Sequence, residues 1–229
     1  MRRSPSNSRR TIVQSNMHNI AILGAGRVGT ALARRALSAG FEVRVATSRP
    51  AAENAVMLQI VAPGAIVASA EDAVAASDII VLALPLSKYR NLKPELLQDK
   101  IVVDAMNYWA PTDGTLAEFE GATSSSEVVQ RFLKGARLVR SFNHMGYHEI
   151  EDSARPDGHA ERRAMAVAGD DAQANLIVAA FIDRLGFDPV ISGGLASSRL
   201  FAGGTPIFGA AMTRIEIQQH LGPLSHNPA

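Results

Sequence analysis

Cysteine is absent from this 229-residue chain, and aromatic residues make up only 5% of it. Without a thiol, the chain has no disulfide framework, no thiolate nucleophile, no iron–sulfur cluster and no zinc site built on cysteine. No apolar run approaches the ~20 residues that span a bilayer, and the first residues lack the apolar centre of a secretory signal. We therefore expect a cytoplasmic protein without a membrane partner.

An excess of either charge is also lacking, because 23 basic side chains stand against 22 acidic ones. Residues 1–16 hold four arginines and no acid, which leaves 19 basic and 22 acidic side chains in the rest of the chain. That balance offers no basic surface for nucleic acid. We predict that residues 1–16 form a disordered basic tail. Transit peptides share this Arg- and Ser-rich bias, so a targeting role is the alternative.

Short apolar runs alternate with helical patterns along the rest of the chain. The predicted strands are 19–23, 42–46, 65–68, 78–84, 100–104, 137–142, 164–168 and 188–191, and the predicted helices are 27–38, 92–97, 127–133, 171–185 and, with a Gly-Gly-Thr-Pro break, 195–220. Alternating strands and helices indicate βαβ units. Right-handed crossovers then give a doubly wound, mostly parallel α/β sheet of about eight strands, which is Rossmann-like. We predict this domain over 17–192, with a small helical extension over 193–229.

The first predicted strand runs into a turn with the spacing G-x-G-x-x-G, and a predicted helix follows. Gly24 allows the tight turn, Gly26 lets the backbone approach a pyrophosphate, and Gly29 lets helix and strand pack closely. The helix N-terminus offers free N–H groups and a positive dipole to phosphates. In this context the motif predicts dinucleotide binding rather than a purely structural turn. The predicted phosphate-binding residues are Gly24, Ala25, Gly26, Arg27, Val28 and Gly29.

The end of the second predicted strand indicates which dinucleotide binds. NAD sites place an acidic residue there for the ribose 2′-OH, but this chain has Thr47, Ser48 and Arg49. Ser48 can hydrogen-bond a 2′-phosphate, and the planar guanidinium of Arg49 can hold it. We predict NADP(H); the alternative is a solvated arginine on a loop.

The ends of three further predicted strands are expected to line the reaction site. Ligands of such sheets bind outside the carboxyl ends of the strands, where the strand order reverses. The residues at these ends are Ala83, Leu84 and Pro85 after the fourth strand, Asn107 after the fifth, and Asn143 and His144 after the sixth. We expect the first two groups near the nicotinamide and the third beside the bound acceptor.

Four segments of the sequence resemble a known protein family. They are IAILGAGRVGTALARRALSAGFEVRVATSR, DIIVLALP, KIVVDAMN and GARLVRSFN. Together with a later G-D-D helix and a G-x-L-x-x-S-R-L element, they resemble the NADP oxidoreductases that depend on coenzyme F420, a deazaflavin. The resemblance covers about residues 18–210. It implies a Rossmann-like domain, commonly dimeric, and hydride transfer between NADPH and the deazaflavin.

The same resemblance implies roles for individual positions. The phosphate loop falls on 25–28, the 2′-phosphate pair on Ser48 and Arg49, and the wall beside the nicotinamide on 83–85. A similar domain forms the cytosolic part of certain membrane metalloreductases, where the acceptor is a flavin. The chain departs from the pattern at Ala52 and Glu53, where related sequences often add a second basic residue.

A second departure concerns the acceptor. The segment 107–114 holds the only tryptophan and differs from the better-known deazaflavin enzymes. Tyr108 and Trp109 are expected either to stack on an aromatic acceptor or to pack a loop or dimer face. The acceptor stays open between coenzyme F420, a flavin and another small redox molecule.

Direct hydride transfer needs no protein nucleophile or metal, because the cofactors carry the chemistry. Asn143 and His144 are the candidates to give a proton or hydrogen bond to the acceptor ring; a backbone-bonded structural role is the alternative for His144. His144 and His148 have the spacing of a helical zinc pair. We expect no metal there, because no third ligand is evident and Gly146 argues against a helix.

Three further expectations concern the chain as a whole. Few residues follow the last predicted strand, so we do not expect the long helical domain of β-hydroxyacid dehydrogenases, pyrroline-carboxylate reductases or imine reductases. A module that binds NADPH without turnover remains an alternative, because fold does not fix function. The mostly apolar segment 201–217 is expected to pack against a partner subunit of a homodimer.

Overall fold

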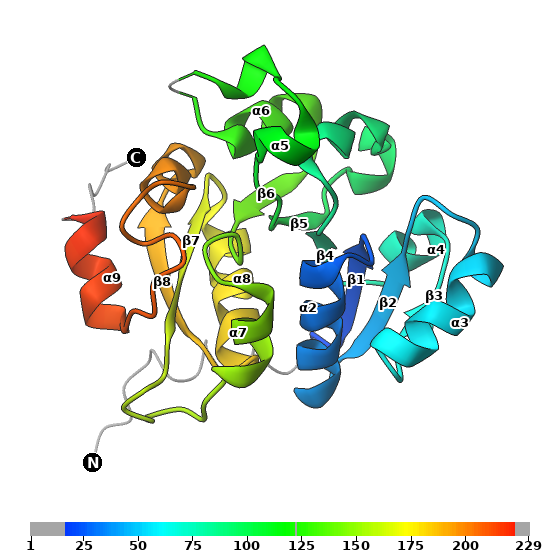
Figure 1. The fold of residues 1–229 in the computed structure, drawn as a ribbon, viewed down its shortest axis with the longest axis horizontal. Coiled ribbons are helices and arrows are strands. Elements are labelled where there is room, and N and C mark those ends of the chain that lie inside the picture. The colour runs from blue at the N-terminus through cyan, green and yellow to red at the C-terminus, as the bar shows by residue number, and fades with distance from the viewer. Residues whose placement is uncertain (1–16, 122, 223–229) are drawn as a thin grey trace.

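The computed structural model describes residues 17–121 and 123–222, so the tail predicted over 1–16 lies outside the described residues. Eight strands form one sheet in the order β3-β2-β1-β4-β5-β6-β7-β8 (Figure 1). Their bounds are β1 Asn19–Leu23, β2 Glu42–Ala46, β3 Ile66–Val67, β4 Ile79–Leu82, β5 Ile101–Asp104, β6 Arg137–Arg140, β7 Ala164–Gly169 and β8 Asp188–Gly193. The predicted doubly wound, Rossmann-like sheet is confirmed.

Strand direction changes once within the sheet. The pairs among β1 to β6 are parallel, β7 runs antiparallel to β6, and β8 runs parallel to β7. The strand order reverses between β1 and β4, because the chain first builds outward to β3 and then returns. Ligands of doubly wound sheets bind at such a reversal, outside the carboxyl ends of the strands.

Helices cover both faces of this sheet. The α-helices are α2 Arg27–Ser38, α3 Ala51–Val61, α4 Ala70–Ala75, α5 Ala110–Asp113, α6 Ser125–Phe132, α7 Tyr147–Asp152, α8 Ala172–Arg184 and α9 Arg214–Leu221, and the 3₁₀ helices are η1 Leu86–Asn91, η2 Pro94–Leu97, η3 Ala117–Phe119 and η4 Leu195–Phe201. Of these, the helices α3, α4, α5, α7, η1 and η3 were not predicted. The helical segment predicted over 195–220 consists of η4 and α9, with residues 202–213 outside both.

No helix spans His144 and His148, as expected from Gly146, but α7 begins directly after this glycine. Gly146 lies at the N-cap of α7, where its N–H donates to Glu149 Oε2 at 2.9 Å and its carbonyl accepts from the Glu149 N–H at 3.0 Å. Glycine is acceptable at this position because the N-cap residue is not yet helical. His148 therefore lies in α7, whereas His144 precedes the helix.

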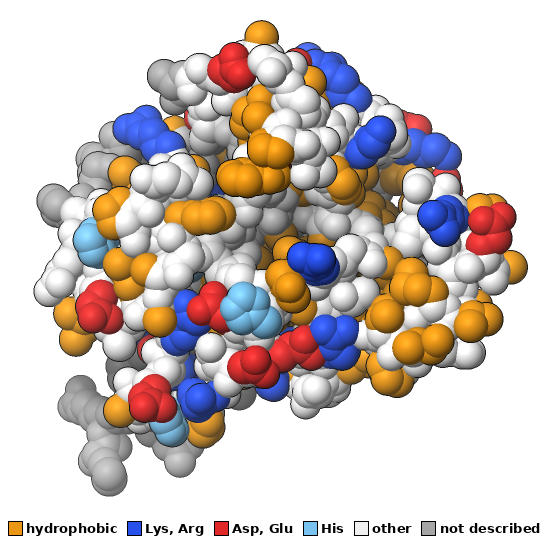
Figure 2. Space-filling model, in the orientation of Figure 1, with side chains coloured by type: hydrophobic (Ala, Val, Ile, Leu, Met, Phe, Trp, Pro, Cys, Tyr) orange, Lys and Arg blue, Asp and Glu red, His pale blue; other side chains and the backbone are white. Residues whose placement is uncertain are grey.

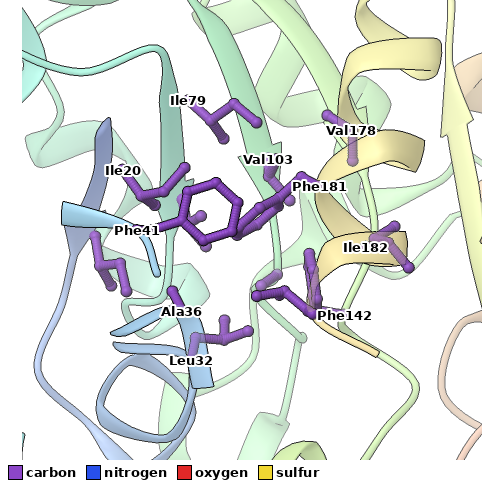
Figure 3. Packing of buried hydrophobic residues seen from close by; sticks show 14 of the residues in the cluster. Ile20, Leu32, Ala36, Phe41, Ile79, Val103, Phe142, Val178, Phe181 and Ile182 are labelled. Atoms are coloured by element: carbon purple, nitrogen blue, oxygen red, sulfur yellow. The ribbon is translucent and has the colours of Figure 1, made fainter. Parts of the chain in front are cut away.

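The strands alternate their side chains between two apolar layers. Ile20 and Ile22 face the layer formed with α2, α7 and α8, whereas Ala21 and Leu23 face the layer formed with α4 and α6. Figure 3 shows Phe41 and Phe181 meeting in the first layer, edge to face with ring centroids 5.2 Å apart. Both faces of the central strands are thus buried, as is typical of parallel sheets.

Helix α7 lies beside α2 on the face shown in Figure 1. Arg34 of α2 donates to both carboxylate oxygens of Glu151 in α7, each at 2.6 Å. This contact fixes the segment that follows β6 against the helix that follows the glycine turn. None of the helices in the described ranges is long and apolar enough to cross a bilayer.

Candidate functional site

The glycine turn after β1 is built around two contacts that exclude side chains. Gly24 has φ +121°, and a Cβ on it would lie 2.3 Å from the Ala83 carbonyl oxygen. A Cβ on Gly29 would lie 2.0 Å from the Gly24 carbonyl oxygen. The first and third glycines are therefore required by the packing of the turn itself, whatever binds there.

Gly26 differs from the other two glycines of the motif. A Cβ on Gly26 would meet no atom within 4 Å, and its φ of −77° is accessible to any residue. The fold therefore does not require glycine at this position. Open space over the N-cap of α2 fits a pyrophosphate that approaches the backbone closely.

The first turn of α2 presents free donors to this open space. The first hydrogen bond of the helix runs from the Thr30 N–H to the Gly26 carbonyl at 2.9 Å. In the described part of the chain, the N–H groups of Arg27, Val28 and Gly29 have no acceptor. Helix α2 has 12 residues, so its dipole adds a positive potential for phosphate oxygens.

The turn after β2 presents the predicted 2′-phosphate pair. Ser48 and Arg49 are exposed, and the Arg49 guanidinium has no hydrogen-bond or ion-pair partner within the described ranges. Gly24 N–H donates to the Ala46 carbonyl at 2.8 Å, which links the glycine turn to the end of β2. The pyrophosphate and adenosine-phosphate positions expected from the sequence therefore lie at adjacent strand ends.

The segment after β4 forms the next wall. The Ala83 N–H donates to the Leu23 carbonyl at 2.9 Å, and the Ala83 carbonyl faces Gly24. Leu84 is half-buried and Pro85 is exposed. Residues 83–85 thus stand directly beside the glycine turn. Figure 2 shows a hollow near the centre of this face, between α2 and the segments that follow β5.

A buried ion pair joins the ends of β5 and β6. Arg140 Nη1 lies 3.1 Å from Asp104 Oδ2, and the two side chains are 3% and 0% exposed. The carboxylate also accepts from Ser126 Oγ at 2.7 Å and from the Met106 N–H at 3.0 Å. Arg140 donates to the Met106 carbonyl as well. Burial lowers the pKa of the Arg140 guanidinium, and the Asp104 carboxylate opposes that shift.

The network continues toward the predicted acceptor side. Asn107 Oδ1 accepts from Arg140 Nη2 at 2.9 Å, and Asn107 Nδ2 donates to the Asn143 carbonyl at 2.7 Å. Asn143 Nδ2 donates to the Phe201 carbonyl at 2.9 Å. The strand-end residues Asn107 and Asn143 are thus brought into contact, and both are connected to the C-terminal part of the chain.

Asn143 keeps one unused acceptor. Its Oδ1 is buried without a partner among the described residues. The preceding residue, Phe142, has φ +63°, which is unusual for a bulky residue and turns the chain sharply at the end of β6. Backbone of this kind clusters at functional sites. The apolar pattern of β6 gave no indication of this turn.

His144 is buried, with 2% of its surface exposed. Its Nε2 accepts the Ala166 N–H of β7 at 3.0 Å, so the neutral ring carries its proton on Nδ1. Burial, together with the positive charges of Arg163 and Arg140, lowers the pKa of His144 to about 4. This geometry favours the structural alternative, in which His144 connects the β6 end to β7.

The lowered pKa of His144 predicts acid sensitivity. The unfolded chain takes up a proton near pH 6.5, whereas folded His144 resists until about 4, so stability is complete above pH 6.5 and is lost as the pH falls toward 4. We expect the free energy of unfolding to decrease by about 2 kcal/mol between pH 7 and pH 5. Urea unfolding of His144→Gln should lack most of this decrease.

Exposed His148 provides the matched control. His148→Gln should keep the wild-type pH dependence. An equal loss of stability in His144→Gln and in the wild type over this range would show that another group is responsible.

Tyr108 and Trp109 have different environments. The Tyr108 hydroxyl donates to the Gly114 carbonyl at 3.0 Å and accepts the Leu116 N–H at 3.1 Å, which favours loop packing. Trp109 is 64% exposed. The backbone N–H of Trp109 donates to Asp113 Oδ2 at 2.8 Å. Trp109 therefore keeps its indole face available to a ligand or a partner.

Within residues 17–121 and 123–222, no cluster of three or more His, Asp or Glu side chains is arranged to hold a metal ion. The spacing of His144 and His148 does not place them on one helix, because α7 begins after His144. Arg140, Ser126 and Phe142, which shape this region, were missed by the sequence analysis. Only the sequence KIVVD, with an acid ending a buried strand, hinted at the ion pair.

The family resemblance is confirmed by a family model. Residues 19–108 match the model described as NADP oxidoreductase coenzyme F420-dependent. These residues run from β1 through the segment after β5, and so contain the glycine turn, the β2 end and the β4 wall.

Individual proteins of known sequence or structure are also similar. The metalloreductase STEAP3 of Rattus norvegicus is 28% identical over 182 residues, which is 79% of this chain and 35% of that protein. The chain thus spans about a third of that relative's length. A crystal structure of the hypothetical protein SMa0349 from Sinorhizobium meliloti has a TM-score of 0.73 at 28% identity and covers 87% of this chain and 97% of its own.

A second solved structure is a candidate F420-dependent NADP reductase from Arthrobacter sp. FB24, with a TM-score of 0.68 and 28% identity over 80% of this chain and 87% of its own. An imine reductase from Pseudomonas sp., at 18% identity and a TM-score of 0.55, shares the fold alone. Residues 19–108 therefore carry the similarity to the family of coenzyme F420-dependent NADP oxidoreductases.

Proposed function

We propose that this protein transfers a hydride between NADPH and a planar redox acceptor, with the deazaflavin coenzyme F420 as the first candidate. The observation that carries the proposal is the open space at Gly26, which no packing requirement explains. It lies beside two free groups suited to phosphate, the first-turn N–H donors of α2 and the exposed Arg49. The family match supports the same nucleotide.

The residues present fit NADP(H). The N–H groups of Arg27 and Val28 would hold the pyrophosphate, and Ser48 and Arg49 would hold the 2′-phosphate. Residues 83–85 would form the wall beside the nicotinamide. When bound, NADPH supplies the hydride, which carries two electrons to the acceptor, and one proton comes from solvent.

The chain itself positions the reactants and excludes water. We assign Asn143 to hydrogen-bond the acceptor, because its Oδ1 is buried and unpartnered. His144 is neutral near pH 7, so it does not supply the proton and instead connects the β6 end to β7. The exposed indole of Trp109 is the candidate to stack on the acceptor.

Mixing the protein with NADPH and coenzyme F420, while following absorbance at the nicotinamide and deazaflavin bands, tests the proposal. Equal loss of both bands supports it. The similarity to a metalloreductase favours a second candidate, an NADPH-dependent flavin reductase. Reduction of flavin mononucleotide without reduction of F420 would select that candidate. Tight NADPH binding with no acceptor reduced would instead favour a sensor module.

Charge reversal at the β2 end should weaken NADPH binding. Arg49→Glu places a carboxylate beside the proposed 2′-phosphate, so we expect the dissociation constant for NADPH to rise at least about tenfold. NADH, which lacks this phosphate, should bind at least as tightly as it does to the wild type. Energy transfer from Trp109 to the bound nicotinamide provides a binding signal. An unchanged NADPH constant would remove Arg49 from the site.

The proposal also covers the domains of the chain and its oligomeric state. Residues 17–192 would form the nucleotide-binding domain of a cytoplasmic protein, and residues 193–229 would complete the acceptor site or a homodimer face. Phe208 and Ile215 are 39% and 67% exposed in that segment, which supports a partner surface there. Light scattering on the purified protein tests the homodimer.

A further inference from the structure

Asn54 is a buried polar residue in the first turn of α3, next to the proposed 2′-phosphate site. Only 4% of its surface is exposed. Asparagine is a modest helix former, and a buried amide is costly unless its hydrogen bonds are made. Its presence here therefore needs a specific explanation.

All contacts of the Asn54 amide nitrogen go to the turn after β2. Nδ2 lies 2.6 Å from Thr47 Oγ1, 3.1 Å from the Arg49 carbonyl oxygen and 3.1 Å from the Pro50 carbonyl oxygen. The Thr47 hydroxyl in turn accepts the Arg49 N–H at 3.1 Å. Both backbone polar groups of Arg49 are thus held, one directly by Asn54 and the other through Thr47.

This arrangement fixes the backbone while leaving the ligand-binding side chains free. Ser48 and Arg49 remain exposed, and the described residues provide the Arg49 guanidinium with no partner. The N-cap residue of α3, Pro50, makes no side-chain cap, and Asn54 Nδ2 instead donates to the Pro50 and Arg49 carbonyls at the entry to the helix. The direction from which Arg49 leaves the backbone is therefore set before any ligand arrives.

The charges near Arg49 make the orientation of its side chain important for phosphate binding. Ala52 and Glu53 follow the pair, so this stretch supplies Arg49 as its only cation and adds an acid nearby. A single guanidinium binds a phosphate well only when it is presented in the right orientation. Pre-organisation lowers the entropy lost on binding and so offsets the missing second cation.

We propose that Asn54 is a positioning residue that gives the site its preference for nucleotides with a 2′-phosphate. This inference rests on the proposed function, since it assumes that Ser48 and Arg49 meet that phosphate. Asn54 acts through the Arg49 backbone and does not itself contact the nucleotide.

The test compares Asn54→Ala and the volume-filling Asn54→Leu with the wild type by calorimetric titration of NADPH, 2′,5′-ADP and NADH. We expect the dissociation constants of NADPH and 2′,5′-ADP to rise about threefold to tenfold, which corresponds to releasing one ordered side chain. The NADH constant should stay at its wild-type value, because the change is confined to the 2′-phosphate.

Asn175 is the matched control, because it is also 4% exposed and donates a backbone bond, from Nδ2 to the Gly169 carbonyl at 2.7 Å. Asn175→Ala should lose stability but keep the wild-type ratio of NADH to NADPH constants. An unchanged ratio in the folded Asn54 variants, or an equal change in Asn175→Ala, would overturn the inference.

Different results would contradict the proposed function and the proposed role of Asn54. If the wild type binds neither NADPH nor 2′,5′-ADP, the proposed function is wrong and the role of Asn54 falls with it. If the wild type prefers NADPH and Arg49→Glu removes the preference while both Asn54 variants retain it, the proposed function stands and only this inference fails.

Discussion

Gly26→Ala is expected to fold like the wild type and to lose nearly all affinity for NADPH. The added methyl group meets no protein atom within 4 Å, so it causes no clash in the free protein. It fills the space through which a pyrophosphate would approach the first turn of α2. Losing two charge-assisted hydrogen bonds to phosphate corresponds to a rise in the dissociation constant of about a hundredfold.

Thermal unfolding and calorimetric titration of the same sample check both halves of this prediction. The N-cap exchange from glycine to alanine should cost about 1 kcal/mol of stability at most. Gly29→Ala is the contrasting variant, because its Cβ would lie 2.0 Å from the Gly24 carbonyl oxygen. We expect it to lose about 3 kcal/mol of stability through overpacking. Wild-type NADPH affinity in Gly26→Ala would show that phosphate binds elsewhere.

Breaking the Asp104–Arg140 pair should destabilise the fold strongly. Arg140→Met leaves the Asp104 carboxylate buried without its cation, and removing one member of a buried pair typically costs about 3–5 kcal/mol. The double variant Asp104→Asn/Arg140→Met removes both charges, so we expect it to be more stable than Arg140→Met alone. Denaturant unfolding of the wild type, both single variants and the double variant gives the coupling energy.

The half-exposed pair Arg137–Asp171 is the control, with side chains 32% and 38% exposed. Arg137→Met should lose much less stability than Arg140→Met, because solvent screens an exposed pair. Similar losses in Arg140→Met and Arg137→Met would contradict a special role for the buried pair. Additive effects of the two changes in the double variant would contradict direct coupling between Asp104 and Arg140.

The central strands of this fold were predictable because burial on both faces gives continuous apolar runs, whereas β2 was predictable from its alternating pattern. The predicted and observed bounds are the same for β1 and β2. For the other strands they differ by one or two residues at one or both ends. Helix α3 was missed for the opposite reason. Val56 and Ile60 are 69% and 74% exposed, so its apolar residues do not mark one buried face. Helix α7 was missed because it is short and only one of its residues, Ile150, is buried, so it gives no helical apolar pattern.

The nucleotide side of the site was accessible from sequence because it is local. The strand, the three glycines and the Ser48–Arg49 pair are close together in the chain, and each has a stereochemical reason for its position. The acceptor side depends on distant segments. Asn143 meets Phe201 across 58 positions of sequence, and His144 meets Ala166 across 22. No spacing rule connects such residues, so only the fold shows that His144 is committed to β7.

Calorimetric titration of the wild-type protein with NADPH and, separately, NADH tests the central claim most directly. The glycine turn and the Ser48–Arg49 pair predict one NADPH bound per chain, with a dissociation constant at least about tenfold below that of NADH. Absence of heat with NADPH and NADP⁺, or equal constants for NADPH and NADH, would contradict the account.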